Sequence, residues 1–255
     1  MDMSSVARHA AEVVKTNGFE EQISILRGKV EDIELEVEKV DIIVSEWMGY
    51  CLLYESMLPS VLFARDKWLT KDGLLLPSSC SLYLAGMTDL AWHDQKFGFW
   101  DNVEGFNMQA MKALAITEPS VDWVNPGSML TEPFLLKNFD LHSCTKDDLA
   151  FSVPFSMRAL RGGNLTALVA FFDVEFEDGH KSMSLSTSPW AAPTHWKQTI
   201  FHLKHAFLVA EGQVVGGNLG LSPNSRNERD LDLTVEVRRE EEEGEVTEHS
   251  LFKLR

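Results

Sequence analysis

Two sequence patterns meet near residue 80, and together they limit the folds open to this chain. Before that point come a β-branched run at Val40–Val44, an amphipathic stretch at Met57–Leu69 and a further apolar run at Leu74–Leu76. This order of strand, helix and strand is typical of a doubly wound α/β sheet. After it, short alternating runs separated by Gly, Pro, Asn and Asp are typical of a β-barrel or sandwich. We therefore predict an α/β plus β protein, divided into residues 1–79 and 80–255.

Local signals place further elements in both units. Val6–Asn17 has helical spacing, Ile23–Leu26 is interpreted as a short strand, and Asp72–Gly73 is expected to form a turn. The Val40–Val44 run is interpreted as a buried parallel strand. From about residue 92 to 124, a helical pattern interrupts the β unit. The remaining predicted strands are Leu82–Ala85, Phe134–Leu141, Ala167–Phe176, Lys181–Ser186, Thr199–Leu203, Gly217–Leu221 and Leu231–Val237.

Composition excludes several classes of protein. The 255 residues are 44% apolar, which suffices for a sizeable buried core. No apolar run is long enough to span a bilayer, and the first residues lack the features of a signal peptide, so we expect no membrane partner. Cys51, Cys80 and Cys144 are odd in number and widely spaced. We therefore expect reduced, half-buried thiols, with no disulfide framework and no metal site.

The chain is strongly acidic. It has 39 acidic and 23 basic residues, which gives a formal net charge of −16 with histidine neutral. Such a charge repels the phosphates of nucleic acids and attracts basic proteins, so we expect arginine-rich protein partners and no direct nucleic-acid binding. The run of glutamates at 240–245, around Gly244, is interpreted as a solvated hairpin turn without a function of its own.

Two carboxylates follow the β-branched run, Glu46 in SEWMGY and Glu55 in YESM. Ligands of open α/β sheets bind beyond the carboxyl ends of the strands. A single acid at that place more often complements a helix dipole. Two acids with aromatic neighbours instead make a partly dry pocket for a cation, and a guanidinium fits it best because it is planar, always charged and carries five donors.

The stretch Ser45–Met57 resembles the double-glutamate loop of the protein arginine methyltransferases, type I branch. Thr194–Gln198 (THWKQ) is similar to the Thr-His-Trp loop of that family, and Phe97–Met111 to its dimerisation arm. The resemblance implies an incomplete Rossmann-like methyltransferase domain, followed by a β-barrel domain with a helical dimerisation arm at about 92–124. It also implies a homodimer. On composition alone, the aromatic residues of the arm could equally fill the core of the barrel.

The resemblance further implies methyl transfer from S-adenosyl-L-methionine to protein arginines, giving asymmetric dimethylarginine. Histone tails or RNA-binding proteins would be substrates. Glu46 and Glu55 would hold the guanidinium and offset the repulsion between two cationic reactants. His195 would orient the acid loop through a hydrogen bond, or take part in proton removal. Trp196, which could also be a core indole, would line the substrate pocket together with Tyr50 and Met57.

Cofactor residues are implied by the same resemblance. Asp2 matches the family's acid that accepts both ribose hydroxyls, although the second residue of a chain is often disordered. Val30 and Glu31 match positions that contact adenine, and they could otherwise belong to a surface turn.

The resemblance starts at Asp2, so the family's first strand, its glycine-rich turn and its N-terminal helices have no counterpart here. We therefore expect a partial chain whose cofactor half is incomplete and whose methyl transfer is weak or absent. The alternative is a truncated, non-catalytic dimerising or substrate-binding scaffold of the same family. More remote is an unrelated β-sandwich binding module. The expected location is the cytoplasm, the nucleus or both, since no basic cluster indicates an import signal.

Overall fold

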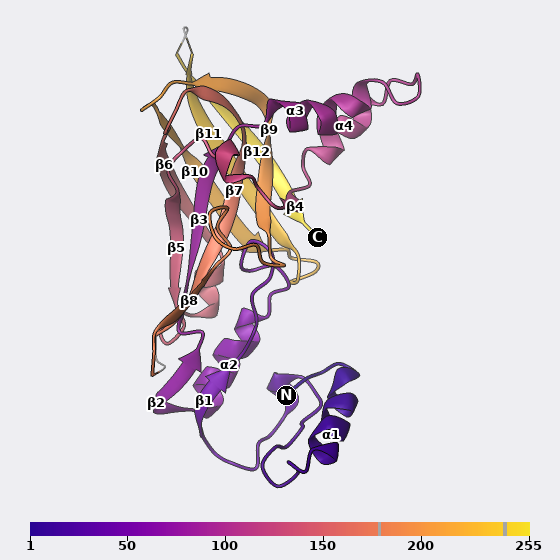
Figure 1. Ribbon diagram of the computed structural model, residues 1–255, viewed down its shortest axis with the longest axis vertical. Coiled ribbons are helices and arrows are strands. Elements are labelled where there is room, and N and C mark those ends of the chain that lie inside the picture. Colours follow the sequence, from indigo (N-terminus) through magenta and orange to yellow (C-terminus); the bar gives the residue numbers. More distant parts are fainter. Residues whose placement is uncertain (178–179, 242–243) are drawn as a thin grey trace.

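A tall β unit carries a helical arm near one end and a more open N-terminal segment at the other (Figure 1). This computed structural model describes residues 1–177, 180–241 and 244–255, without the side chains of residues 239–241, 244 and 245. The α-helices are α1 Val6–Thr16, α2 Leu58–Trp68, α3 Leu90–His93 and α4 Gln109–Ala115. Shorter helical segments are η1 Val30–Asp32, η2 Asp94–Gly98, η3 Phe99–Asp101, η4 Pro126–Ser128 and η5 Lys146–Leu149. The strands are β1 Val40–Val44, β2 Leu69–Leu76, β3 Ser79–Met87, β4 Ser120–Asp122, β5 Phe134–Asp140, β6 Phe151–Arg158, β7 Gly163–Phe176, β8 Met183–Ser186, β9 Gln198–Val209, β10 Val214–Pro223, β11 Leu231–Glu241 and β12 Gly244–Leu254.

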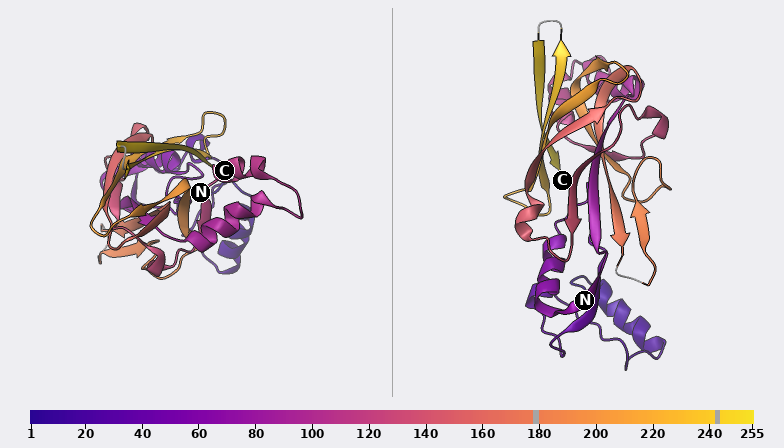
Figure 2. Two further views of the ribbon diagram at one scale, coloured as in Figure 1. Left: turned by 90° about the horizontal axis from the view of Figure 1, so that it is seen from above. Right: turned by 90° about the vertical axis from the view of Figure 1, so that its left-hand side faces the viewer.

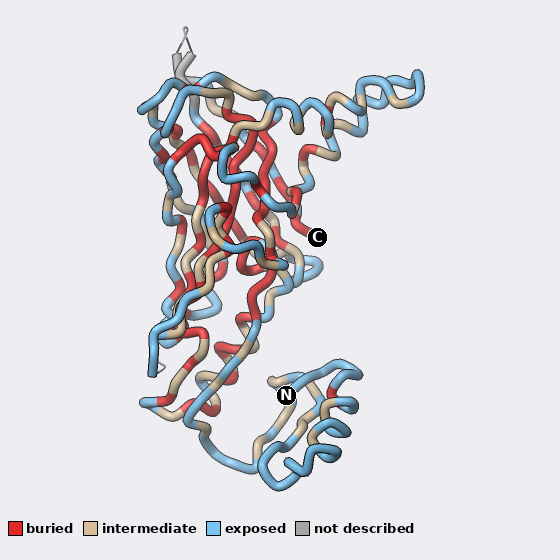
Figure 3. Tube along the Cα trace, in the orientation of Figure 1, coloured by how far each residue is buried: buried red, intermediate tan, exposed pale blue. Residues whose placement is uncertain are grey.

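The β unit consists of two antiparallel sheets. One has the order β12-β11-β10-β6, and the other has β4-β9-β7-β3-β5 with β8 added beside β7. On β11, the side chains of Leu231, Leu233 and Val235 are all buried, as the alternation of apolar and polar residues predicts. The buried residues concentrate in this unit (Figure 3). All seven predicted strands are present, whereas β4, β6 and β12 were not predicted.

The N-terminal segment differs from the prediction in three places. The predicted strand Ile23–Leu26 is wrong: these residues form no strand, and it is the next residue, Arg27, that makes an isolated parallel bridge to Asp2. Asp72–Gly73 does not form a turn, because it lies inside the continuous strand β2. β1 does pair in parallel with β2, yet it is not buried. Among the described strands β2 is its only neighbour, and much of this segment is exposed (Figure 3).

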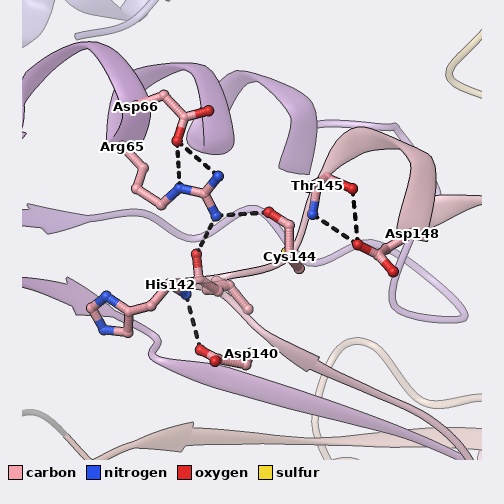
Figure 4. A network of polar contacts seen from close by, with 8 residues as sticks. Arg65, Asp66, Asp140, His142, Cys144, Thr145 and Asp148 are labelled. Atoms are coloured by element: carbon pink, nitrogen blue, oxygen red, sulfur yellow. Dashed lines mark hydrogen bonds and ion pairs between the residues drawn. The ribbon is translucent and has the colours of Figure 1, made fainter.

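Helix α2 connects this segment to the β unit. Its Leu58, Val61 and Leu62 are buried, as predicted. Arg65, whose side chain is only 11% exposed, donates from Nη1 to the carbonyls of Leu141 and Cys144 over 2.7 and 2.8 Å (Figure 4). Charge-assisted bonds to buried carbonyls are among the stronger hydrogen bonds. They fix α2, and the loop that precedes it, against the connection between β5 and η5.

The arm, which contains α3 and α4, projects sideways from the β unit (Figure 1; seen from above in Figure 2). Phe97 is 1% exposed and packs against the β unit, whereas Phe99 is 54% and Phe106 is 71% exposed. The aromatic residues of the arm therefore divide between a buried base and an exposed outer part. Only the base contributes to the core of this chain.

Three polar side chains meet at the base of the arm. His202, on β9, is 1% exposed, and its Nε2 lies 3.1 Å from the hydroxyl oxygen of Ser120. The Lys96 ammonium donates to the same hydroxyl. The His202 ring also stacks on Trp92, with ring centroids 4.5 Å apart, and meets the edge of Phe97 at 5.1 Å. Burial, and then the nearby charges of Lys96 and a second histidine, lower the pKa of His202 from 6.5 to about 3.

This histidine should make the fold sensitive to mild acid. Below pH 6.5, the unfolded chain binds a proton at His202 that the folded chain does not bind until about pH 3, so stability falls as the pH is lowered through that window. We expect a loss of about 2 kcal/mol between roughly pH 6.5 and 5. Urea unfolding at the two pH values would measure it. His202→Gln should remove most of this loss, and an equal loss in the variant would contradict the assignment.

Several expectations from composition can be compared with the described residues. Cys51, Cys80 and Cys144 are free, and they are buried rather than half-buried. In the described part of the chain, no helix is long and apolar enough to cross a membrane. Nor do the described residues bring three or more His, Cys, Asp or Glu side chains into a metal-binding group. The tip of the predicted glutamate hairpin, residues 242–243, lies outside the described residues.

Candidate functional site

The double-acid loop is a tightly closed turn between β1 and α2. The Gly49 amide donates to the Leu52 carbonyl over 2.9 Å. Gly49 also lies so close to Tyr54 that an added Cβ would stand 1.9 Å from the Tyr54 carbonyl oxygen. The backbones at the two sides of the turn are therefore in contact, and Glu46 and Glu55 extend from its two ends.

This turn requires strained backbone. Four residues that are not glycine have positive φ angles: Cys51 at 52°, Leu52 at 67°, Glu55 at 75° and Ser56 at 51°. Each such residue costs on the order of 1–3 kcal/mol, and it persists only where the surroundings hold it. Because Ser56 lies in this strained region and α2 begins at Leu58, Ser56 does not cap the helix. Contacts with residues outside the loop are therefore needed to hold its strained backbone.

Trp196 makes one of those contacts. Its indole Nε1 donates to the Met48 carbonyl over 2.9 Å, and its ring meets the edge of Phe172 with centroids 5.8 Å apart. Only 8% of Trp196 is exposed. Since Phe172 belongs to β7, this indole joins the core of the β unit to the double-acid loop. The two loops quoted from the sequence are therefore in direct contact.

The Thr194–Gln198 segment is itself fixed by residues next to β4. The indole of Trp123 donates to the Thr194 carbonyl over 3.3 Å. The Lys197 ammonium lies 3.2 Å from the Asp122 carboxylate and 4.2 Å from the centre of the Trp123 ring. These contacts set the position of Trp196, and through it the position of the acid loop.

His195 is exposed, and its ring lies 3.9 Å from that of Trp196. The hydrogen bond to the acid loop that we expected from His195 is made by Trp196 in the described structure. A role for His195 in the reaction stays a prediction. Two buried polar atoms in these loops, Trp47 Nε1 and Thr194 Oγ1, have no partner among the described residues.

Of the predicted substrate residues, the two acids, Tyr50 and Met57 lie on the double-acid loop, whereas Trp196 lies on the other loop and is buried. Glu46 and Glu55 are both exposed. The rings of Tyr50 and Tyr54 are nearly parallel, at 11°, with centroids 6.0 Å apart. Tyr50 is 37% exposed and Met57 is 45% exposed. Carboxylates beside aromatic faces suit a planar cation. Their assignment to substrate binding stays a prediction.

The predicted cofactor residues are close together along the backbone. Asp2 forms its bridge to the chain just before η1, which contains Val30 and Glu31. A hydroxyl and an amide of Ser4 hold the pKa of the Asp2 carboxyl below its ordinary value. The Glu31 carboxylate accepts a hydrogen bond from the Ser60 hydroxyl over 2.5 Å. Asp2 and Glu31 are ionisable acceptors on an exposed surface, as binding to ribose and adenine requires.

Two of the hollows on the described surface border the β unit. One, of about 690 Å³, is bordered by Lys204 on β9 and by Glu236 and His249 on β11 and β12. The other, of 320 Å³, lies between Ser56, η5 and the connection from β10 to β11. Neither contains the two acids. The two acids thus lie outside both hollows, and the hollow of 320 Å³ adjoins the end of the double-acid loop at Ser56.

Sequence reasoning missed Arg229, whose guanidinium Nη2 lies 3.4 Å from Glu55 Oε2. It also missed Arg65, which fixes α2. Arg229 could have been identified by its position in Asn224–Asp230, an Asn-rich connection directly before a predicted strand. In a chain with 39 acids and 23 bases, a cation in such a turn is apt to meet a carboxylate.

Comparison with known proteins identifies relatives of this chain. The family model described as the arginine methyltransferase oligomerization subdomain matches residues 78–242. Protein arginine N-methyltransferase 1 of Chlamydomonas reinhardtii is 42% identical over all 255 residues, which correspond to 74% of that protein. The probable protein arginine N-methyltransferase 1.2 of Arabidopsis thaliana is also 42% identical over the whole chain, which covers 70% of it.

Solved structures extend the likeness to the fold. The Trypanosoma brucei PRMT1 enzyme-prozyme heterotetrameric complex with AdoHcy has a TM-score of 0.94 and 40% identity, over 99% of this chain and 80% of the other. Protein arginine methyltransferase 10 of Arabidopsis thaliana, in an open conformation, has a TM-score of 0.86 and 26% identity, over 99% of this chain and 81% of the other.

The fold and the two loops define a class of protein, one with a Rossmann-like methyltransferase unit joined to an oligomerisation β unit. This chain belongs to the protein arginine methyltransferase family. The predicted fold class is confirmed, with the β unit formed by two sheets. The predicted boundary between residues 79 and 80 stays a prediction.

Proposed function

We propose that this chain transfers methyl groups from S-adenosyl-L-methionine to arginine side chains of proteins, giving asymmetric dimethylarginine. The observation that carries the proposal is a closed loop, tied to the β unit by Trp196, whose end residues Glu46 and Glu55 are exposed. Relatives that are 42% identical over the whole chain are protein arginine N-methyltransferases.

The acids would act by charge and by position. An arginine guanidinium stays protonated at neutral pH, since its pKa is above ~12. Glu46 and Glu55 would accept its N–H donors, hold its plane and aim one terminal nitrogen, with the stacked tyrosines as one wall. The attacking nitrogen loses a proton only as its new bond forms, and a carboxylate oxygen or His195 could accept that proton. The strained, tethered loop keeps the acids in place before substrate arrives.

S-adenosyl-L-methionine fits the described residues at its adenosine end. Asp2 would accept the ribose hydroxyls, and Glu31 the exocyclic amine of adenine, beside Val30. When bound, this cofactor supplies an electrophilic methyl group on a sulfonium. The AdoHcy named with the solved T. brucei PRMT1 complex supports the same cofactor class for this chain.

The arm supports self-association. Its outer residues Phe99, Phe106 and Leu114 are 54%, 71% and 61% exposed, and several large, exposed apolar side chains on one short segment favour a contact surface. The matched family model is an oligomerization subdomain. We propose a homodimer in the cytoplasm, the nucleus or both. With a net charge of −16, basic proteins such as histone tails or RNA-binding proteins would be its substrates.

Purified chain, S-adenosyl-L-methionine and an arginine-rich peptide test the proposal. Mass spectrometry of the peptide should show added methyl groups, and chromatography of its hydrolysate should show asymmetric dimethylarginine. Sedimentation of the same sample should show the mass of two chains. A peptide that stays unmethylated would contradict methyl transfer by this chain and favour the scaffold described next, and symmetric dimethylarginine would exclude the product assigned here.

A second candidate is a non-catalytic dimerising or substrate-binding scaffold. It is supported by β1, which among the described strands pairs only with β2 and leaves Ile42 and Val44 52% and 72% exposed. Titration with S-adenosylhomocysteine separates the two candidates. Binding at micromolar strength, about −8 kcal/mol, supports the enzyme. Peptide binding without any binding of S-adenosylhomocysteine supports the scaffold.

A further inference from the structure

The connection between β10 and β11 contacts Glu55 through both the backbone and the side chain of Arg229. The Glu55 amide donates to the Arg229 carbonyl over 2.8 Å. In addition, Arg229 Nη2 lies 3.4 Å from Glu55 Oε2. One residue therefore touches both the amide and the carboxylate of one of the two acids assigned to the substrate.

The connection that holds Arg229 is stiffened by its own hydrogen bonds. The Asn224 side chain donates to the Asp232 carboxylate over 2.8 Å, and the Asn224 amide donates to the Asp230 carbonyl over 2.9 Å. The Arg229 amide bonds to the Asn227 side chain over 3.3 Å. Strand pairing closes both ends of the connection. Arg229 thus extends from a preformed support, so its position does not depend on the acid loop.

Glu55 needs outside support because its φ angle is 75°. A glutamate in this region is strained, and it keeps that conformation only where neighbouring groups hold it. The Arg229 carbonyl supplies one such bond to the backbone. The guanidinium then acts on the carboxylate, the part of Glu55 that would meet the substrate.

We propose that Arg229 is a positioning residue for Glu55. It holds Oε2 and leaves Oε1 to accept from the substrate guanidinium, and this inference rests on the proposed methyl transfer. The two side chains are 67% and 55% exposed, so the pair adds little to folding stability. Its effect lies in the angle at which Glu55 faces the substrate.

Replacement of Arg229 separates its two contacts, because any residue keeps the backbone carbonyl. For Arg229→Gln we expect kcat for peptide methylation to fall roughly tenfold with little change in KM. Arg229→Lys keeps the positive charge but lacks the planar guanidinium, so its kcat should lie between those of Arg229→Gln and the parent. Arg226→Gln removes the same charge from the same connection and should match the parent. A lower KM with unchanged kcat would instead make Arg229 a competitor of the substrate, and unchanged kcat and KM would make the pair a surface contact only.

A spectroscopic measurement tests the contact without activity. In protein labelled with ¹⁵N, the Arg229 Nε–H signal should shift in Glu55→Gln and stay in place in Glu38→Gln, an exposed glutamate before β1. If the Arg229 Nε–H signal does not shift in Glu55→Gln, the inference is wrong. If that signal responds while the parent chain transfers no methyl group, the proposed function fails, and the positioning role falls with it.

Discussion

Glu46→Gln is expected to lower the rate of methyl transfer roughly a hundredfold to a thousandfold. The amide replaces a full negative charge beside a guanidinium, and its NH₂ group can turn a donor toward a partner that has only donors. Because Glu46 is exposed, the free energy of unfolding should change by less than about 0.5 kcal/mol. Steady-state kinetics with an arginine-rich peptide, together with urea unfolding, would show both results.

Glu38→Gln is the matched control for this variant. Glu38 is exposed, lies just before β1, and loses the same charge by the same change. We expect parental kinetics from it, since a change in net charge alone acts weakly through screened solvent. If Glu46→Gln methylated as well as Glu38→Gln, the acid loop would not bind the guanidinium and the proposed mechanism would be wrong.

Sequence patterns predicted the elements whose residues repeat with a clear period. β11 alternates strictly from Leu231 onward, and α2 buries Leu58, Val61 and Leu62 at helical spacing. Both were found where the pattern placed them. The sequence signals of β6 and β12 are weak for different reasons. Pro154 interrupts the pattern of β6, and the pattern of β12 follows a run of glutamates. Pairing with β10 and β11 overrides these weak local signals.

Burial in the N-terminal segment could not be predicted from local sequence. Val40–Val44 is rich in β-branched residues, which indicates a strand buried on both faces, yet Val44 is 72% exposed. A strand becomes buried through its neighbours, and the five residues carry no information about which strands flank them. For the same reason, Ile23–Leu26 has a strand-like composition and forms no strand.

The residues of the candidate site were predicted from the sequence, but the hydrogen bonds and ion pairs that hold them were not. The two acids, the two tyrosines and the Thr-His-Trp segment can be recognised as motifs, because the chemical properties of these side chains follow from residue type alone. The bond from Trp196 to Met48 spans 148 positions, and Arg229 reaches Glu55 from the connection between β10 and β11. Such contacts depend on packing over long sequence distances. This is why the sequence favoured His195 as the tether, whereas the indole beside it makes the bond.

Gly49→Ala adds one methyl group, and we expect this group to disrupt the turn that positions the two acids. An added Cβ at Gly49 would lie 1.9 Å from the Tyr54 carbonyl oxygen and 2.7 Å from its carbon. Both are backbone atoms, so no rotation of a side chain can relieve the clash. The turn must open, which breaks the bond from the Gly49 amide to the Leu52 carbonyl and displaces Glu55, the next residue after Tyr54. We expect methyl transfer to fall more than about a hundredfold.

The same change should cost only about 1–3 kcal/mol of folding stability, since the turn can relax outward while both sheets of the β unit stay intact. Urea unfolding would give this value, and circular dichroism should keep the β signal of the parent. Gly98→Ala is the control, because a Cβ at Gly98 meets nothing within 4 Å and its φ of −64° suits alanine. A Gly49→Ala protein with parental stability and parental activity would show that the close approach of Gly49 and Tyr54 does not shape the site. Reduced activity with a normal β signal would instead locate the defect in the turn that positions the two acids.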